Sequence, residues 1–123
     1  MNSADNSDPS EGMLPSSREV EMVVLGAMLL EPQTLGSLVM ARLTDKHFDY
    51  AVHQVLFREM TACIRENVCL DLITLTQRLQ DKDLLKAIGG PVYLSDLVCT
   101  VPMNKDIEKY VDNIANKGKT RSM

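Results

Sequence analysis

Apolar residues recur at helical spacing along most of the chain and predict a series of short amphipathic helices. The strongest period predicts one long helix that ends near Asn67, and its apolar positions are Val52, Val55, Leu56, Met60, Cys63 and Ile64. Apolar residues on all sides of the segment 20–29 indicate a central helix, which Pro32 stops. Shorter stripes cover residues 35–43, 72–79, 93–98 and 107–114. Because no two-residue alternation lies between turn signals, the pattern predicts an all-α fold, a compact bundle of six or seven short helices.

Residues of the types that begin and end helices mark the boundaries of these segments. Ser16 and Glu19 are expected to form a capping box, and Asp71 and Asn104 are expected N-caps. Gly89 is expected to terminate an apolar cluster, and Pro102 is expected to break a helix.

The composition divides the chain into one domain and two short ends. The 123 residues, of which 45% are apolar, suffice for a single core. Residues 1–14 are polar and acidic and predict a disordered tail, because they have little to bury. The helical periodicity predicts one helical domain over residues 15–115. Residues 116–123 are basic and include Gly118, so we expect a frayed end that leads toward a linker outside this chain.

Charge and hydropathy argue against two classes of protein. Lys and Arg total 13 against 17 for Asp and Glu, so the clustered basic excess that phosphate binding requires is absent and we expect no dominant DNA binding. No apolar run approaches the roughly eighteen residues of a membrane span, and the polar start is unlike a secretory signal. The sequence therefore predicts a soluble, cytoplasmic protein without a membrane partner.

Candidate catalytic and ligand-binding patterns fail on their spacing. Gly118-Lys119-Thr120 matches the second half of a phosphate-binding loop, but Asn113 stands where the first glycine belongs. His47 and His53 lack metal-ligand spacing, and we expect His53 to bond a neighbouring backbone or carboxylate group. We therefore expect no catalytic, cofactor-binding or metal-binding residue in this chain.

Several stretches, in this order, resemble the N-terminal domain of the bacterial replicative DNA helicase, the DnaB family. They cover residues 15–114 and comprise Pro15–Gly26 with Leu29, His47-Phe48, His53–Phe57, Asp71–Leu75 with Leu79, Gly89-Gly90 with Tyr93-Leu94, and Pro102–Tyr110. The chain departs from the family at Arg18, where an apolar residue is usual, and at Asn116, Gly118 and Thr120, where helix formers are usual.

The resemblance implies a helical head with a truncated start of a helical hairpin, which pairs and then assembles as three dimers into a collar above an ATPase ring. It implies a non-catalytic role in assembly and in docking primase, with a helicase loader as a further partner. ATP and magnesium are expected only on the motor domain, which lies outside this chain. For the self-association surface we expect the stripe of the last helix, which consists of Ile107, Tyr110, Val111 and Ile114.

Two alternative functions stay open. A stand-alone helical DNA-binding regulator would need a recognition helix, but the best candidate, residues 74–82, offers only Gln77, Arg78 and Gln80 beside an Asp. A truncated antagonist of helicase assembly would use the same surfaces as the collar domain, so the sequence does not separate these two.

Overall fold

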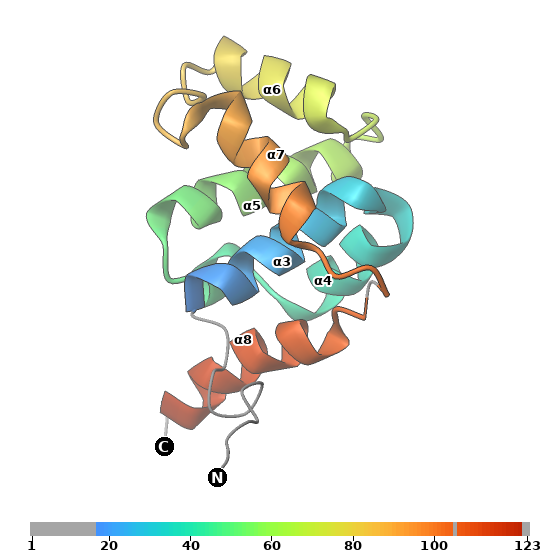
Figure 1. Cartoon of the computed structure of the whole chain (residues 1–123), viewed down its shortest axis with the longest axis vertical. Helices are drawn as coiled ribbons and strands as arrows, with labels where there is room; N and C mark the ends of the chain where they lie inside the picture. The colour runs from blue at the N-terminus through green and yellow to red at the C-terminus, as the bar shows by residue number, and fades with distance from the viewer. Residues whose placement is uncertain (1–16, 105, 122–123) are drawn as a thin grey trace, which may run out of the picture.

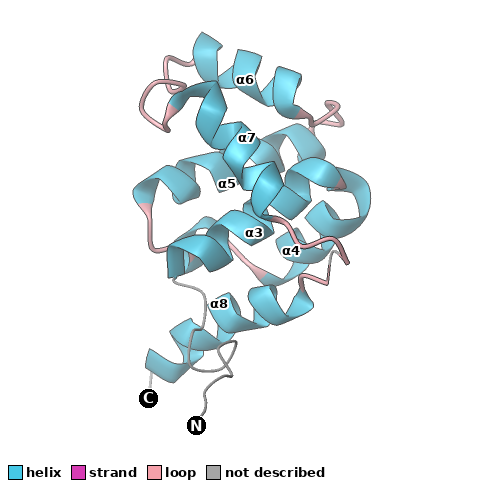
Figure 2. Cartoon of the chain, viewed as in Figure 1, coloured by secondary structure: helices cyan, strands magenta, loops and turns pink. Residues whose placement is uncertain are grey.

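Helices account for all the regular structure in residues 17–104 and 106–121, which are the residues that the computed structural model describes (Figure 1). No strand occurs among them (Figure 2), so the all-α prediction is confirmed. The elements are α3 (Ser17–Leu30), η1 (Pro32–Gly36), α4 (Ser37–Arg42), η2 (Asp45–His47), α5 (Ala51–Arg65), α6 (Leu72–Asp81), α7 (Gly90–Thr100) and α8 (Glu108–Arg121). The predicted disordered tail at residues 1–14 and the expected cap Ser16 lie outside the described residues.

Helix α3 lies at the centre of the bundle, as its apolar pattern predicts. Every residue from Val20 to Leu29 is buried. Helices α4, α5, α7 and α8 all pack against it. Wrapping on all sides explains why the segment has apolar residues around its whole circumference.

Helices α3 and α7 approach each other closely at Gly26. A Cβ atom built on Gly26 would overlap the carbonyl oxygen of Leu97 and lie 2.8 Å from Cγ2 of Val101. The first of these neighbours is backbone, so it cannot move aside as a flexible side chain could. Any side chain at position 26 would therefore push the two helices apart.

The predicted boundaries of α5 and α6 are confirmed. Asn67 adopts a left-handed φ of 60° just beyond the end of α5. Asp71 then caps α6, because one of its carboxylate oxygens accepts a hydrogen bond of 2.8 Å from the backbone N–H of Thr74. That bond lowers the pKa of the Asp71 carboxyl.

The predicted boundaries of α3 and α7 are also confirmed. Helix α3 ends before Pro32, which opens a short π-helical turn leading into α4. Gly89 and Gly90 have φ values of 111° and 79°, which L side chains rarely adopt, and α7 begins there. The helix ends at Thr100, just before Pro102.

Helix α8 differs from the sequence prediction at its start. Asn104 does not cap it; its side-chain oxygen accepts from the backbone N–H of Asp106 at 3.1 Å, which is a local turn, and α8 begins four residues after Asn104. The helix extends to Arg121, and the expected fraying after Ala115 stays a prediction. Burial of Ile107 fixes the start, and once the first turns are held against the core, each added residue contributes another helical hydrogen bond.

We expect Gly26→Ala to lower the free energy of unfolding by about 2 kcal/mol or more, because overpacking at a backbone contact outweighs the higher helix propensity of alanine. Urea denaturation followed by circular dichroism measures this change. The matched control is Cys99→Ala on the exposed surface of α7, which should change stability by less than about 0.5 kcal/mol. Equal stability of Gly26→Ala and the wild-type chain would contradict the close-contact argument.

Candidate interaction surface

The stripe expected to form a self-association surface is mostly core in the structure. Ile107, Val111 and Ile114 are each no more than 1% exposed. Val111 and Ile114 lie on α8, which Ile107 directly precedes, and this helix packs against α3, α4 and η2. The surface prediction is therefore wrong for these three residues, because the chain's own helices cover them. Tyr110 remains half-buried, with the ammonium group of Lys109 5.5 Å from its ring centroid, and its role in self-association stays a prediction.

Large apolar side chains instead face solvent on α6 and α7. Ile73 is 81% exposed and Val92 is 71% exposed. Sequence reasoning missed both, although a signal was present. Each is a β-branched apolar residue next to, but off, the apolar stripe of its helix, where a polar residue is usual.

A hollow of about 290 Å³ lies between these two helices beside the exposed side chains. Its lining comes from both helices and is apolar or uncharged, and consists of Leu72, Ile73, Thr76, Gln77, Pro91 and Ser95. Such a surface presents shape and apolar area, and none of its lining residues is titratable near neutral pH.

A buried polar network joins three helices at the other side of α7. The carboxylate of Glu21 on α3 is fully buried and accepts a hydrogen bond of 2.6 Å from Nδ1 of His53 on α5. It also accepts a bond of 2.7 Å from the backbone N–H of Asp49. The hydroxyl of Tyr93 on α7 lies 2.6 Å from Nε2 of the same imidazole ring. Since a carboxylate can only accept, Nδ1 of His53 donates to Glu21, and the other ring nitrogen, Nε2, pairs with the hydroxyl of Tyr93.

This network confirms the structural role expected of His53. Both ring nitrogens of His53 are occupied by protein partners, and the ring is only 1% exposed. Arg18, which stands where the resemblance led us to expect an apolar residue, places its guanidinium 5.4 Å from the Tyr93 ring centroid. Burial raises the pKa of the Tyr93 hydroxyl, although Arg18 acts in the opposite direction. The arrangement holds α3, α5 and α7 together.

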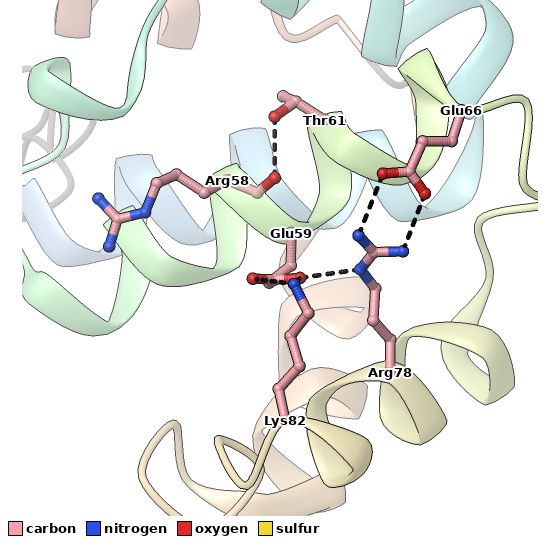
Figure 3. A network of polar contacts seen from close by, with 6 residues as sticks. All are labelled: Arg58, Glu59, Thr61, Glu66, Arg78 and Lys82. Atoms are coloured by element: carbon pink, nitrogen blue, oxygen red, sulfur yellow. Dashed lines mark hydrogen bonds and ion pairs between the residues drawn. The ribbon is translucent and has the colours of Figure 1, made fainter.

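A second polar network fixes α6 on α5 (Figure 3). The carboxylate of Glu59 accepts from Nε of Arg78 at 2.8 Å and from Nζ of Lys82 at 3.1 Å. The other two guanidinium nitrogens of Arg78 reach Glu66 at 3.4 Å. Burial pushes the pKa of Glu59 upward, but the bonds from Arg78 and Lys82 outweigh it and leave the pKa below its usual value. The bonds that Arg78 donates to Glu59 and Glu66 raise the pKa of its guanidinium.

The second network bears directly on the alternative of a DNA-binding regulator with a recognition helix at residues 74–82. Only 20% of the Arg78 side chain is exposed, and its guanidinium is held by two carboxylates of α5 and the turn after it. A base-reading arginine must be free to reach the edge of a base pair. The guanidinium of Arg78, on the candidate recognition helix, is therefore already paired with carboxylates of this chain.

The remaining candidate motifs take part in local structure within the described part of the chain. Gly118-Lys119-Thr120 lies within α8, where backbone N–H groups are used by helical hydrogen bonds and form no phosphate cradle. His47 accepts a bond of 2.9 Å from the backbone N–H of Thr44 through Nδ1. No three His, Cys, Asp or Glu side chains among residues 17–104 and 106–116 come together as a metal site. Within the described helices, none is both long and apolar enough to cross a bilayer.

We expect His53→Ala to lower the free energy of unfolding by about 3–5 kcal/mol, because it leaves the buried Glu21 carboxylate without its strongest partner. Tyr93→Phe, which removes one hydroxyl at the edge of the network, should cost only about 1 kcal/mol. The double variant Glu21→Leu with His53→Leu should recover much of the loss, since no charge is then buried. Urea denaturation of the three variants measures these differences, and an H53A cost near that of Y93F would contradict the argument.

The α5–α6 network predicts a stability difference that depends on pH. Because the pKa of Glu59 is lowered from its usual value of 4.5, the stabilisation is fully present above pH 4.5 and is lost as the pH falls through the lower pKa of the folded state. Glu59→Gln should therefore cost about 1–2 kcal/mol at pH 7 and progressively less below pH 4.5. Asp45→Asn, which breaks the exposed ion pair with Arg58, is the control and should change little at either pH. A pH-independent cost of Glu59→Gln would rule out the charge as its cause.

Comparison with known proteins identifies the family to which this fold belongs. The model of the DnaB-like helicase N-terminal domain matches residues 13–116. The chain is 35% identical over 116 residues to the replicative DNA helicase DnaB of Geobacillus stearothermophilus, covering 93% of this chain and 25% of the relative. It is 31% identical over 110 residues to DnaB of Buchnera aphidicola, covering 89% of this chain and 24% of the relative. The chain thus spans about a quarter of the length of these curated relatives.

A solved structure agrees with the sequence matches. The N-terminal domain of DnaB helicase from Mycobacterium tuberculosis superposes with a TM-score of 0.78 at 30% identity, covering 85% of this chain and 75% of that one. The resemblance inferred from the ordered sequence motifs is confirmed. Because the family model, the sequence relatives and the fold agree over most of its length, the chain belongs to the DnaB-like helicase N-terminal domain family.

Proposed function

We propose that this chain is a non-catalytic assembly and primase-docking domain of a hexameric, ATP-dependent replicative DNA helicase. The observation that carries the proposal is the family match over residues 13–116. In this proposal the domain pairs with a second copy, contributes to a collar of dimers and presents surfaces to primase. ATP hydrolysis belongs to another part of the helicase, and a helicase loader is a further partner.

The surface chemistry supports a binding role. The buried polar side chains Glu21 and His53 are hydrogen-bonded to each other, and Glu21 also accepts a bond from the backbone N–H of Asp49. Exposed apolar side chains, in contrast, stand on α6 and α7, and each helix is anchored by fully buried leucines. Rigidly held apolar surface favours association with another protein, because it is removed from water without a large loss of conformational freedom.

The charge distribution disfavours a DNA-binding function. The sequence carries a net charge of −4, and Arg78 and Lys82 of α6 are paired with acidic side chains of this chain. Counterion release from phosphates, which drives DNA binding, needs basic side chains that are free.

The proposal predicts that the chain associates with itself and with primase. Sedimentation equilibrium of the purified chain should show reversible self-association, and addition of the helicase-binding domain of the cognate primase should produce a heavier species. A primase fragment that lacks this domain is the matched control and should leave the distribution unchanged. A strict monomer that ignores primase would contradict the proposal, and salt-dependent binding of duplex DNA by that monomer would favour the regulator instead.

A further inference from the structure

A pocket of about 310 Å³ lies where α3, α5 and α7 begin. The first turns of these helices are on the same side of the bundle, at the left in Figure 1. The lining includes two cations, Arg18 and Lys86, and three ring side chains, Tyr50, His53 and Tyr93. Apolar residues and a glycine complete it. Small-molecule sites occupy about 300–1,000 Å³ and combine apolar walls with a few polar groups, so this pocket has the size and composition of a site for a compact ligand.

The two cations of this pocket, Arg18 and Lys86, are available to a ligand. Both side chains are exposed, and within residues 17–104 and 106–116 neither forms an ion pair with a carboxylate. No Asp or Glu among the described residues lines the pocket. The carboxylate of Glu21 lies next to His53, but it is fully buried and already bound by that ring and by the backbone N–H of Asp49. An anion between the two cations is therefore attracted by both, without competition from a carboxylate of the lining.

The starts of α5 and α7 add to the positive potential of the pocket. Tyr50 and Gly89 are the N-cap residues of these helices, and neither provides a side-chain hydrogen bond to the first turn. Neither helix has an acidic residue in its first turn. The N–H groups of a first turn carry a partial positive charge, which favours an anion nearby. The pocket therefore combines two full charges with the positive ends of two helix dipoles.

The three rings form a wall of the pocket that the chain itself holds in place. The centroid of the His53 ring lies 5.5 Å from that of Tyr50 and 5.9 Å from that of Tyr93. Hydrogen bonds with Glu21 and Tyr93 fix the orientation of the His53 ring. The guanidinium of Arg18 lies 5.4 Å from the Tyr93 centroid, and this contact orients the cation. Since these groups are ordered before a ligand arrives, binding costs little conformational freedom.

Charge and shape together favour one class of ligand. A phosphate monoester carries a charge of about −1.5 to −2 at pH 7, which Arg18 and Lys86 can balance. Tyr50 is 42% exposed, so part of its side chain is open to packing against a flat ring of the ligand. A nucleoside monophosphate has both parts, a flat base and a phosphate monoester, within one small molecule. A longer phosphate chain carries more negative charge than the two cations balance.

We propose that this pocket binds a nucleoside monophosphate, with the phosphate between Arg18 and Lys86 and the base against Tyr50. The inference does not rest on the proposed function, because it invokes neither self-association nor primase. Arg18 stands where the resemblance led us to expect an apolar residue, so the site distinguishes this chain from relatives that carry an apolar residue there.

A series of related compounds tests which parts of the ligand the pocket holds. Isothermal titration calorimetry with the full chain should detect binding of adenosine monophosphate and of cytidine monophosphate, since stacking tolerates either base. Adenosine, ribose 5-phosphate and inorganic phosphate should each bind at least about tenfold more weakly than adenosine monophosphate. Equal affinity for any of these three compounds would overturn the assignment of base and phosphate. No binding of either nucleotide at millimolar concentration would overturn the site.

Substitutions in the lining test the role of each group. Arg18→Leu and Lys86→Gln should each raise the dissociation constant for adenosine monophosphate by at least about tenfold. Tyr50→Ala should raise it by at least about fivefold, whereas Tyr50→Phe keeps the ring and should change it little. The matched control is Arg65→Leu, which removes the same charge from an exposed residue at the opposite end of α5. A loss of affinity in Arg65→Leu equal to that in Arg18→Leu would assign the effect to overall charge and overturn the site.

Amide chemical shifts of the wild-type chain locate the ligand without any substitution. Titration with adenosine monophosphate should shift the resonances of Val52, Gly89 and Tyr93, which line the pocket. The resonances of Ile73 and Thr76, which line the separate hollow between α6 and α7, should not move. Shifts centred on that hollow, or spread over the chain without a centre, would overturn the inference. Circular dichroism and melting temperature of the pocket variants should stay near those of the wild-type chain, because the three substituted side chains are exposed.

Discussion

The contact between α3 and α7 at Gly26 is the constraint on which the rest of the bundle depends. A glycine at this position lets the backbone of one helix reach the carbonyl of Leu97 in the other, at a distance that no larger residue permits. Because α3 is wrapped by most of the other helices, its separation from α7 sets the width of the whole core. A close-packed interior transmits a shift at this contact to its neighbours.

The polar side chains follow from the same arrangement. With α7 held against α3, the Tyr93 hydroxyl reaches the imidazole of His53, which in turn binds the buried carboxylate of Glu21. Each of the three groups comes from a different helix, so the network forms only when α3, α5 and α7 are correctly placed. A half-formed network would leave a buried charge unpaired, and this cost favours one packing over its alternatives.

The way each helix packs on the core decides which apolar side chains remain exposed. Helix α8 uses its apolar stripe to close the bundle against α3 and α4, and the ion pair of Arg42 with Asp112 adds a tie at its edge. Helices α6 and α7 instead bury one face and leave Ile73 and Val92 outside. The most exposed apolar side chains on the described helices therefore lie on α6 and α7.

The sequence by itself determined the class of fold, most helix boundaries and the family. Local rules identify these features because each acts within a few residues. They are the helical periodicity, the cap at Asp71, the positive φ angles of Gly89 and Gly90, and the break at Pro102. Only the tertiary structure decided that Ile107, Val111 and Ile114 are core and that Ile73 and Val92 are exposed. An apolar stripe looks the same whether it packs on its own chain or on a partner, because the hydrophobic effect depends on removal from water and not on which molecule covers the stripe.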